Sequence, residues 1–296
     1  MSQCLLITAY RDFNQLESLV RRYLALCEGG KVFIHVDKNT PSKDYGFLLS
    51  EYHDGTQVRI FSKYRISWGS FNHLRAVLFL LKQALKSPGK ADFSFIHIVS
   101  GADFPIKNDF SVFEEDPHIY MTCSPLRATD LSIQSRYITK HFFTSLGLQS
   151  KTYQRINRWI SRSFSGRFLQ NERIGPFLIK DIYKGMIWAS MPMSAAQYVI
   201  AFLKRRDGKA FLHGLRSCEI PEEVFFQTVF MNSVLRDRVV CDNLRFTSWV
   251  FKNGSIPAVL DMDDYERMKA SNSFFCRKVD SVLSKELIQK LGNDSR

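Results

Sequence analysis

The stretch CLLITA at residues 4–9 begins the pattern that decides the fold. This short apolar run has the composition of a buried strand, and from Asp12 onward apolar side chains recur at helical spacing. Gly29-Gly30 ends that helix, and a second apolar run, VFIHVD at residues 32–37, follows it. A strand, a helix and a second strand in this order predict a βαβ unit with parallel strands.

Further segments continue this alternation. Strands are predicted at residues 58–61 and 93–99, with a helix between them that ends near residue 86. The later predictions are strands at 186–191, 244–249 and 273–279 and helices at 194–204, from Pro221, and at 284–291. We therefore predict an α/β fold in a single domain over residues 1–296, with a mainly parallel sheet flanked by helices and an elaborated C-terminal half.

Two acidic residues stand where predicted strands end. Asp37 closes the second strand, and Asp103 lies in the turn SGADFP, residues 100–105, after the fourth strand. Ligands of parallel sheets gather at the carboxyl ends of the strands. Asp37 and Asp103 are therefore candidate binding residues.

The charge of the chain indicates an anionic partner. Its 296 residues include 41 lysines and arginines against 29 aspartates and glutamates, a formal net charge of +12. Nucleic acid, a phosphorylated ligand and an acidic membrane surface all fit this charge. A basic amphipathic helix predicted at residues 153–168 fits an anionic membrane, and it fits a plain solvated surface equally well.

The cysteines and the start of the chain favour a reducing compartment. The six cysteines are scattered without a CxxC pair, and a chain of this length does not depend on disulfides. Residues 1–9 carry no basic leader, and no apolar run approaches the roughly 18 residues of a membrane span. We expect a cytoplasmic protein. The alternative is a protein bound peripherally to the cytoplasmic face of the inner membrane.

Several common catalytic motifs are absent from the sequence. It has no Walker A loop, no GxGxxG, no GxSxG and no HExxH. The segment DMDD at residues 261–264 contains a DxD pattern, but it precedes a short polar helix, where acidic residues cap the N-terminus. No metal site is predicted. A nucleoside diphosphate would then need fixed cations, and Arg245 and Lys278 are candidates, although each alone is also typical of an ordinary surface cation.

The stretch IPEEVFFQT at residues 220–228 places two adjacent carboxylates before an aromatic run. A proline followed by acidic residues is typical of the first turn of a helix. The same arrangement suits a general base at the rim of a pocket. The residues alone leave both interpretations open.

The segment Ser67-Trp68-Gly69 has two interpretations as well. A glycine at the start of a helix allows close backbone approach, and a helix N-terminus suits an anion. Simple packing of the tryptophan explains the segment equally well.

Taken together, these pieces resemble one enzyme family. The matching segments, in family order, are IHVD at 34–37, SWG at 67–69, SGADFPIK at 100–107, PEEVFFQT at 221–228, DNLRFTSW at 242–249 and FFCRKVD at 274–280. The ordered set is similar to the core-2/I-branching N-acetylglucosaminyltransferase and peptide O-xylosyltransferase family. The resemblance implies a GT-A-type, Rossmann-like α/β fold and metal-independent transfer of a sugar from a UDP-sugar, with inversion at the anomeric carbon.

The resemblance also implies roles for single residues. It makes Glu223 the general base, and it assigns the diphosphate to Arg245 and Lys278. The other donor-binding positions that it implies are Asp37 near the nucleoside and, at the floor of the donor site, Ser67, Trp68, Gly69, Gly101 and Asp103. The expected acceptor-binding residues are Lys184, Trp188 and Glu222.

One position departs from the family pattern. In the xylosyltransferase branch an aspartate precedes the tryptophan equivalent to Trp188, whereas this chain has Ile187. Glu223 is then the natural base, and the donor stays open between UDP-N-acetylglucosamine and UDP-xylose. We expect about residues 1–120 to bind the nucleotide sugar, and about residues 121–296 to bind the acceptor and carry catalysis.

Two other classes of protein fit part of the sequence. A catalytically silent sugar-binding relative would share the same motifs. A basic nucleic-acid-binding protein would share the charge, but no recognition motif of that class occurs, and the basic residues are spread along the chain. The expected partners are therefore a UDP-sugar donor and a glycan or glycolipid acceptor, with no nucleic acid.

Overall fold

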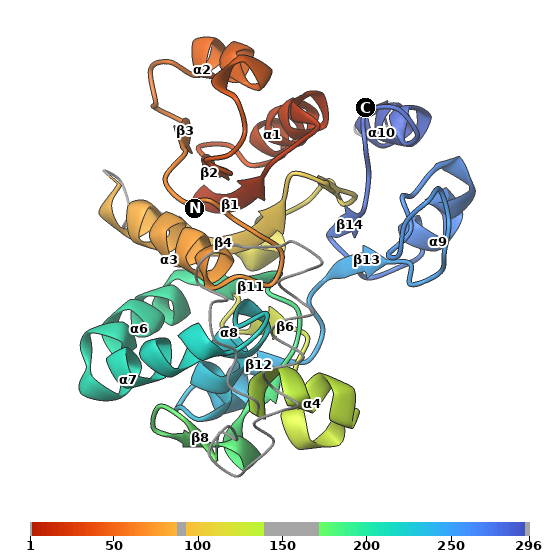
Figure 1. Ribbon diagram of the computed structural model, residues 1–296. Coiled ribbons are helices and arrows are strands. Elements are labelled where there is room, and N and C mark those ends of the chain that lie inside the picture. The colour runs from red at the N-terminus through yellow and green to blue at the C-terminus, as the bar shows by residue number, and fades with distance from the viewer. Residues whose placement is uncertain (1, 88–92, 139–171, 294–296) are drawn as a thin grey trace.

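A computed structural model describes residues 2–87, 93–138 and 172–293, and a seven-stranded sheet lies at its centre (Figure 1). In sheet order the strands are β12 (Val239–Val240), β6 (Ile119–Met121), β11 (Ala189–Pro192), β4 (Phe93–Ser100), β1 (Ser2–Ala9), β2 (Lys31–Val36) and β3 (Val58–Phe61). The strands of this sheet run in one direction except β11, which is antiparallel to both of its neighbours. The prediction of an α/β fold with a mainly parallel sheet is confirmed.

Helices cover both faces of the sheet. In β1, Leu5 and Ile7 pack into a core shared with α1 (Phe13–Leu26), while Leu6 packs into the opposite core with α3 (Phe71–Lys86). Figure 1 shows these two helices on opposite sides of the sheet. Strands that are buried on both faces read as continuous apolar runs, so the sequence reveals them clearly.

The second half of the chain completes the same sheet. Residues 186–191 are predicted to form a strand, but β11 begins only at Ala189, which leaves Trp188 just before it. The helices α6 (Met193–Lys204), α7 (Arg206–Gly214) and α8 (Glu222–Met231) contribute to the same core as α3. The two halves of the chain therefore share one sheet and the core on the α3 side of it.

The two predicted strands at 244–249 and 273–279 form a separate small sheet. Here β13 (Arg245–Thr247) pairs in parallel with β14 (Phe275–Arg277), and β14 pairs with β5 (Asp103–Pro105) in antiparallel fashion. Because β5 follows directly after β4, the small sheet lies beside the carboxyl edge of the central sheet. The other helices and strands are α2 (Gly46–Glu51), α4 (Leu131–Ile138), α9 (Tyr265–Lys269), α10 (Lys285–Asn293), β7 (Ser124–Pro125), β8 (Arg173–Ile174), β9 (Phe177–Leu178) and β10 (Tyr183–Lys184).

Two further predictions concern the membrane and the thiols. The basic helix predicted at residues 153–168 lies outside the described residues. Within the described ranges, none of the helices combines the length and the apolar character needed to cross a bilayer. The six cysteines are free thiols, as predicted; four of them are buried, and Cys241 is exposed.

Candidate active site

The carboxyl ends of β1, β2 and β4 meet at one edge of the sheet. Thr8 lies in register with His35 on one side and with Ser100 on the other. The amide of Gly101 donates to the carbonyl of Thr8 at 3.1 Å, and a Cβ atom at Gly101 would lie 3.2 Å from that of Ala9. Glycine therefore lets the turn after β4 lie close against β1 at this edge.

Asp37 orders the segment that connects β3 to α3. Its carboxylate accepts hydrogen bonds from the backbone amides of Asn39 at 3.0 Å and Ile66 at 3.1 Å. The Nε2 atom of His35 accepts from the amides of Lys63 and Tyr64. These bonds fix the path of the chain into the Ser67-Trp68-Gly69 turn.

The Ser67-Trp68-Gly69 turn contacts the start of α8. Gly69 has a φ of +70°, and its carbonyl accepts a hydrogen bond from the amide of Ile220 at 3.0 Å. The side chain of Trp68 is 71 % exposed. Trp68 therefore lies at the surface, and its role at the floor of the donor site stays a prediction.

The two acidic residues at the start of α8 face different partners. Pro221 occupies the N-cap, so the helix begins with Glu222 and Glu223 in its first turn, as predicted. Glu222 is buried, and its Oε1 atom lies 3.0 Å from Nδ1 of His73 on α3. Glu223 keeps 27 % of its side chain exposed, and its Oε2 atom lies 2.8 Å from Nζ of Lys184. Of the two, only Glu223 keeps part of its side chain exposed.

Lys184 is positioned by β10, which pairs with β7. The next residue, Gly185, donates its amide to the carbonyl of Glu223 at 2.8 Å, and a Cβ atom at Gly185 would overlap the carbonyl oxygen of Thr122. The backbone therefore holds β10 against α8 and brings the ammonium group to Glu223. This placement makes Lys184 a partner of Glu223 as well as an expected acceptor-binding residue.

Trp188 lies between two polar groups. It is buried, with the guanidinium of Arg277 4.5 Å above its ring and the imidazole of His73 at a centroid distance of 5.9 Å. Because the ring of Trp188 is buried, its exposure gives no support to the expectation that it binds the acceptor. Its ring instead packs against the side chains of Arg277 and His73.

The carboxylate of Asp103 lies close to the guanidinium of Arg277. Its carboxylate is fully buried and accepts hydrogen bonds from the amide, at 2.7 Å, and the hydroxyl of Ser100. It lies 3.8 Å from Nε of Arg277, its register partner across β5 and β14. Burial lowers the pKa of the Arg277 guanidinium, and the charge of Asp103 partly opposes this effect. Asp103 therefore helps to orient the guanidinium of Arg277, and its predicted contact with the donor stays a prediction.

Lys278 is half-buried beside Arg277. Its Nζ atom lies 3.1 Å from Oγ of Ser255. Burial lowers the pKa of the Lys278 ammonium, and the nearby positive charges of Arg277 and Arg11 lower it further. Three cations gathered in this way at the strand edge favour a bound anion.

Arg245 has a different environment from the one implied by the resemblance. It is buried, and its guanidinium donates to Oγ of Ser190 at 2.7 Å. It also donates to the carbonyls of Ile98 and Ala189, each at 3.0 Å, and to that of Asn243. Burial lowers its pKa to about 9. The expected contact between Arg245 and a diphosphate is not supported, because these donors already bind β4, β11 and their neighbours.

The sequence analysis did not single out Thr8, His73 or Arg277. Arg277 stands beside Lys278 in the FFCRKVD segment, so the adjacent basic residue was the available signal. His73 follows three residues after Ser70, in the first turn of α3, but a lone histidine gives no sign of its partner. Thr8 is one polar residue in an apolar strand, a pattern with many causes.

The DxD segment is a helix cap, as predicted. Asp261 accepts a hydrogen bond from the amide of Asp263, and Asp264 accepts from the amide of Asp261, which together form a capping box. Lys252 neutralises both carboxylates, at 2.6 and 2.8 Å. Across the described residues, no group of three or more histidine, cysteine or acidic side chains is arranged to hold a metal ion.

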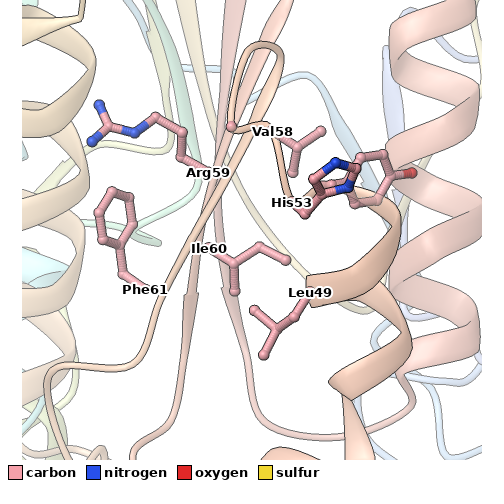
Figure 2. A pocket seen from close by; sticks show the side chains of 8 residues that line it. Leu49, His53, Val58, Arg59, Ile60 and Phe61 are labelled. Carbon is pink, nitrogen blue, oxygen red and sulfur yellow. The ribbon is translucent and has the colours of Figure 1, made fainter.

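A hollow beside β3 is a less convincing candidate. Figure 2 shows Arg59 and Phe61 on one side of this strand, with Val58 and Ile60 on the other. The hollow therefore lies along β3, the strand at the edge of the central sheet. No carboxylate lines it; its titratable side chains are Tyr52, His53 and Arg59, and none of the expected site residues lies there.

Comparison with known proteins identifies the family. A sequence profile described as Core-2/I-Branching enzyme matches residues 5–272. The chain belongs to this family. The resemblance drawn from the ordered motifs is thereby confirmed.

Related sequences include animal xylosyltransferases. Xylosyltransferase 2 of Rattus norvegicus is 24 % identical over 97 % of this chain, and Xylosyltransferase sqv-6 of Caenorhabditis elegans is 25 % identical over 87 %. The matched regions cover 33 % and 32 % of those proteins, so the chain spans about a third of their length.

Solved glycosyltransferase structures show distant similarity. Staphylococcus aureus TarS 1–349 aligns over 81 % of this chain and 57 % of its own, with 12 % identity and a TM-score of 0.37. The mannosyltransferase Ktr4p of Saccharomyces cerevisiae aligns over 76 % and 66 %, with 9 % identity and a TM-score of 0.32. These similarities are too distant to inform the choice of substrate.

Proposed function

We propose that this protein transfers a sugar from a UDP-sugar to a hydroxyl of a glycan or glycolipid, with inversion and with Glu223 as the general base. The observation that carries this proposal is the position of Glu223. It is a partly exposed carboxylate, paired with Lys184, in the first turn of a helix that packs against α3 and β10. Family membership and the xylosyltransferase relatives support the reaction class.

In the proposed reaction, Glu223 takes the proton of the acceptor hydroxyl. As the proton leaves, the oxygen attacks the anomeric carbon from the face opposite the UDP group. The contact with Lys184 at 2.8 Å holds the Glu223 carboxylate in place for this step. Ile187, which stands where the xylosyltransferase branch has an aspartate, is buried and offers no alternative base.

In the proposed reaction, Arg277 and Lys278 stabilise the negative charge of the leaving UDP. Both cations are fixed by neighbouring groups, so they are ordered before the charge develops. We include metal independence in the proposal, with these cations in the role that a divalent ion has in other enzymes.

The donor and the location belong to the proposal as well. UDP-N-acetylglucosamine and UDP-xylose are both retained as donors, and a cytoplasmic location is retained with peripheral contact to an anionic membrane through residues 153–168. Co-sedimentation with anionic vesicles, compared with neutral vesicles, tests the membrane contact.

A thermal-shift screen of nucleotide sugars, followed by a transfer assay, tests the function. A donor that binds the folded protein raises its melting temperature by mass action. We expect UDP and one of the two UDP-sugars to stabilise the protein, and the β-linked product to form with an acceptor glycan. Stabilisation without hydrolysis or transfer would identify a silent sugar-binding relative, and no response to any UDP compound would contradict the proposal.

A further inference from the structure

Three polar side chains form a line from α8 through α3 to β1. Oε1 of Glu222 lies 3.0 Å from Nδ1 of His73, and Nε2 of His73 lies 3.2 Å from Oγ1 of Thr8. Glu222 and Thr8 are 5 % and 7 % exposed, and the His73 side chain is 18 % exposed. The line therefore connects the helix that carries Glu223 with the strand at the centre of the proposed donor site.

The carboxylate of Glu222 sets the direction of the hydrogen bonds in this line. An ionised carboxylate only accepts, so Nδ1 of His73 carries the hydrogen that lies between them. In a neutral imidazole, Nε2 is then an acceptor, and the hydroxyl of Thr8 donates its single hydrogen to Nε2. Oε2 of Glu222 is buried without a hydrogen-bond partner among the described residues, which leaves His73 as the principal partner of this charge.

The direction of these hydrogen bonds decides what the Thr8 hydroxyl can offer a ligand. Once its hydrogen is directed to His73, the hydroxyl oxygen of Thr8 has only lone pairs for a ligand. Thr8 stands at the edge where β1 lies between β2 and β4, beside His35 and Ser100. An oxygen of this kind accepts from a hydroxyl or N–H group and repels a phosphate oxygen.

We propose that Glu222 is a positioning residue that fixes the tautomer of His73, and that Thr8 thereby accepts a hydrogen bond from a hydroxyl or N–H group of the donor sugar or nucleoside. The identity of the ligand rests on the proposed function. This assigns Glu222 to the donor side of the site, in place of the acceptor contact expected from the resemblance.

Nitrogen-15 NMR of the imidazole side chains tests the role of Glu222 in the ligand-free protein. At about pH 8, above the ordinary imidazole range, we expect His73 to carry its hydrogen on Nδ1. In Glu222→Gln the amide can also donate, so we expect the population with hydrogen on Nε2 to rise. The matched control is Glu223→Gln, whose side chain faces Lys184 and which should leave the His73 signals unchanged.

The wild-type spectrum alone can overturn the assignment. Hydrogen on Nε2, or on both nitrogens, would mean that Thr8 accepts from His73, and the proposed polarity would be wrong. An unchanged tautomer in a folded Glu222→Gln protein would remove Glu222 from its positioning role.

Calorimetry with Thr8→Val and Thr8→Ser tests the ligand. Losing one hydrogen bond corresponds to about a threefold to tenfold rise in Kd, and serine should restore binding. A loss for UDP and UDP-sugar alike places the contact on the nucleoside, and a loss for UDP-sugar alone places it on the sugar. Unchanged Kd values for Thr8→Val would refute the contact. If wild-type protein does not bind UDP, the proposed function fails, while the NMR result still decides the role of Glu222.

Discussion

Glu222 and Glu223 show how neighbouring residues of one type acquire separate roles. On a helix, adjacent side chains diverge by about 100°, so two consecutive acids cannot share one partner. Glu222 turns inward to His73, and Glu223 turns to Lys184 and keeps part of its surface exposed. The same contrast separates Lys278, which is half-buried near other cations, from Arg245, which is enclosed by backbone carbonyls.

Replacing Lys278 by methionine should weaken UDP binding. A hydrogen bond to a charged group contributes about 1.5–3 kcal/mol, so we expect the Kd for UDP to rise by roughly tenfold to a hundredfold. Because the ammonium is not fully buried, the free energy of unfolding should change little. Isothermal calorimetry and urea unfolding measure the two effects. An unchanged Kd would exclude Lys278 from the diphosphate site.

Replacing Arg245 by methionine should lower the free energy of unfolding and leave the Kd for UDP little changed. The substitution leaves the carbonyls of Ile98 and Ala189 and the hydroxyl of Ser190 without their donor. We expect the free energy of unfolding to fall by about 2–4 kcal/mol in urea titrations. If stability were unchanged and UDP affinity dropped instead, Arg245 would be the diphosphate ligand that the family resemblance implies.

At the scale of elements, the sequence revealed the strands but not all their partners. The runs at 4–9, 32–37 and 93–99 are largely apolar on both faces, and together with the run at 58–61 they became β1 to β4. The runs at 244–249 and 273–279 are also strands, but a short apolar run does not show which sheet it joins. For the same reason the sequence could propose Arg245 and Lys278 as a pair, yet could not show that Arg245 is buried among backbone carbonyls.

The segment between β3 and α3 depends on a buried neutral histidine. His35 is fully buried and its Nε2 atom accepts from two backbone amides, so burial lowers its pKa from 6.5 to about 4. The unfolded chain then binds a proton more readily than the folded chain between these two values. The contribution of His35 to the free energy of unfolding is complete above about pH 6.5. It is lost as the pH falls towards 4, by up to about 3 kcal/mol.

The variant His35→Gln isolates this contribution. A glutamine oxygen can accept from the same two amides but does not titrate. We expect urea unfolding across this pH range to show a steeper loss of stability for wild-type protein than for the variant, since the carboxylates titrate in both. Parallel pH profiles would show that His35 is not the responsible group.

At the scale of the whole molecule, the site is assembled from both halves of the chain. The first half supplies the strand edge, while the second supplies α8, Lys184 and the Arg277–Lys278 pair. The ordered motifs of both halves lie at the ends of strands and helices, while the expected division into a nucleotide-sugar half and an acceptor half stays a prediction. The sequence could not predict the contact between Glu222 and His73, which are separated by 149 positions and lie on different helices.

Removal of divalent metal tests the proposal that the protein itself supplies the positive charge. If Arg277 and Lys278 neutralise the leaving diphosphate, EDTA should leave the transfer rate within about twofold of its untreated value. The rate is measured before and after chelation, with magnesium or manganese added back. A collapse in EDTA that either metal reverses would contradict this part of the mechanism.

The central claim is tested most directly by Glu223→Gln, which keeps the shape of the side chain and removes the base. We measure sugar transfer and UDP affinity for this variant and for Glu286→Gln, a control on the exposed surface of α10. Glu223 as the base predicts that the transfer rate falls at least about a hundredfold while the Kd for UDP is unchanged, and that the control behaves as wild type. A Glu223→Gln enzyme with near-normal turnover would contradict the claim.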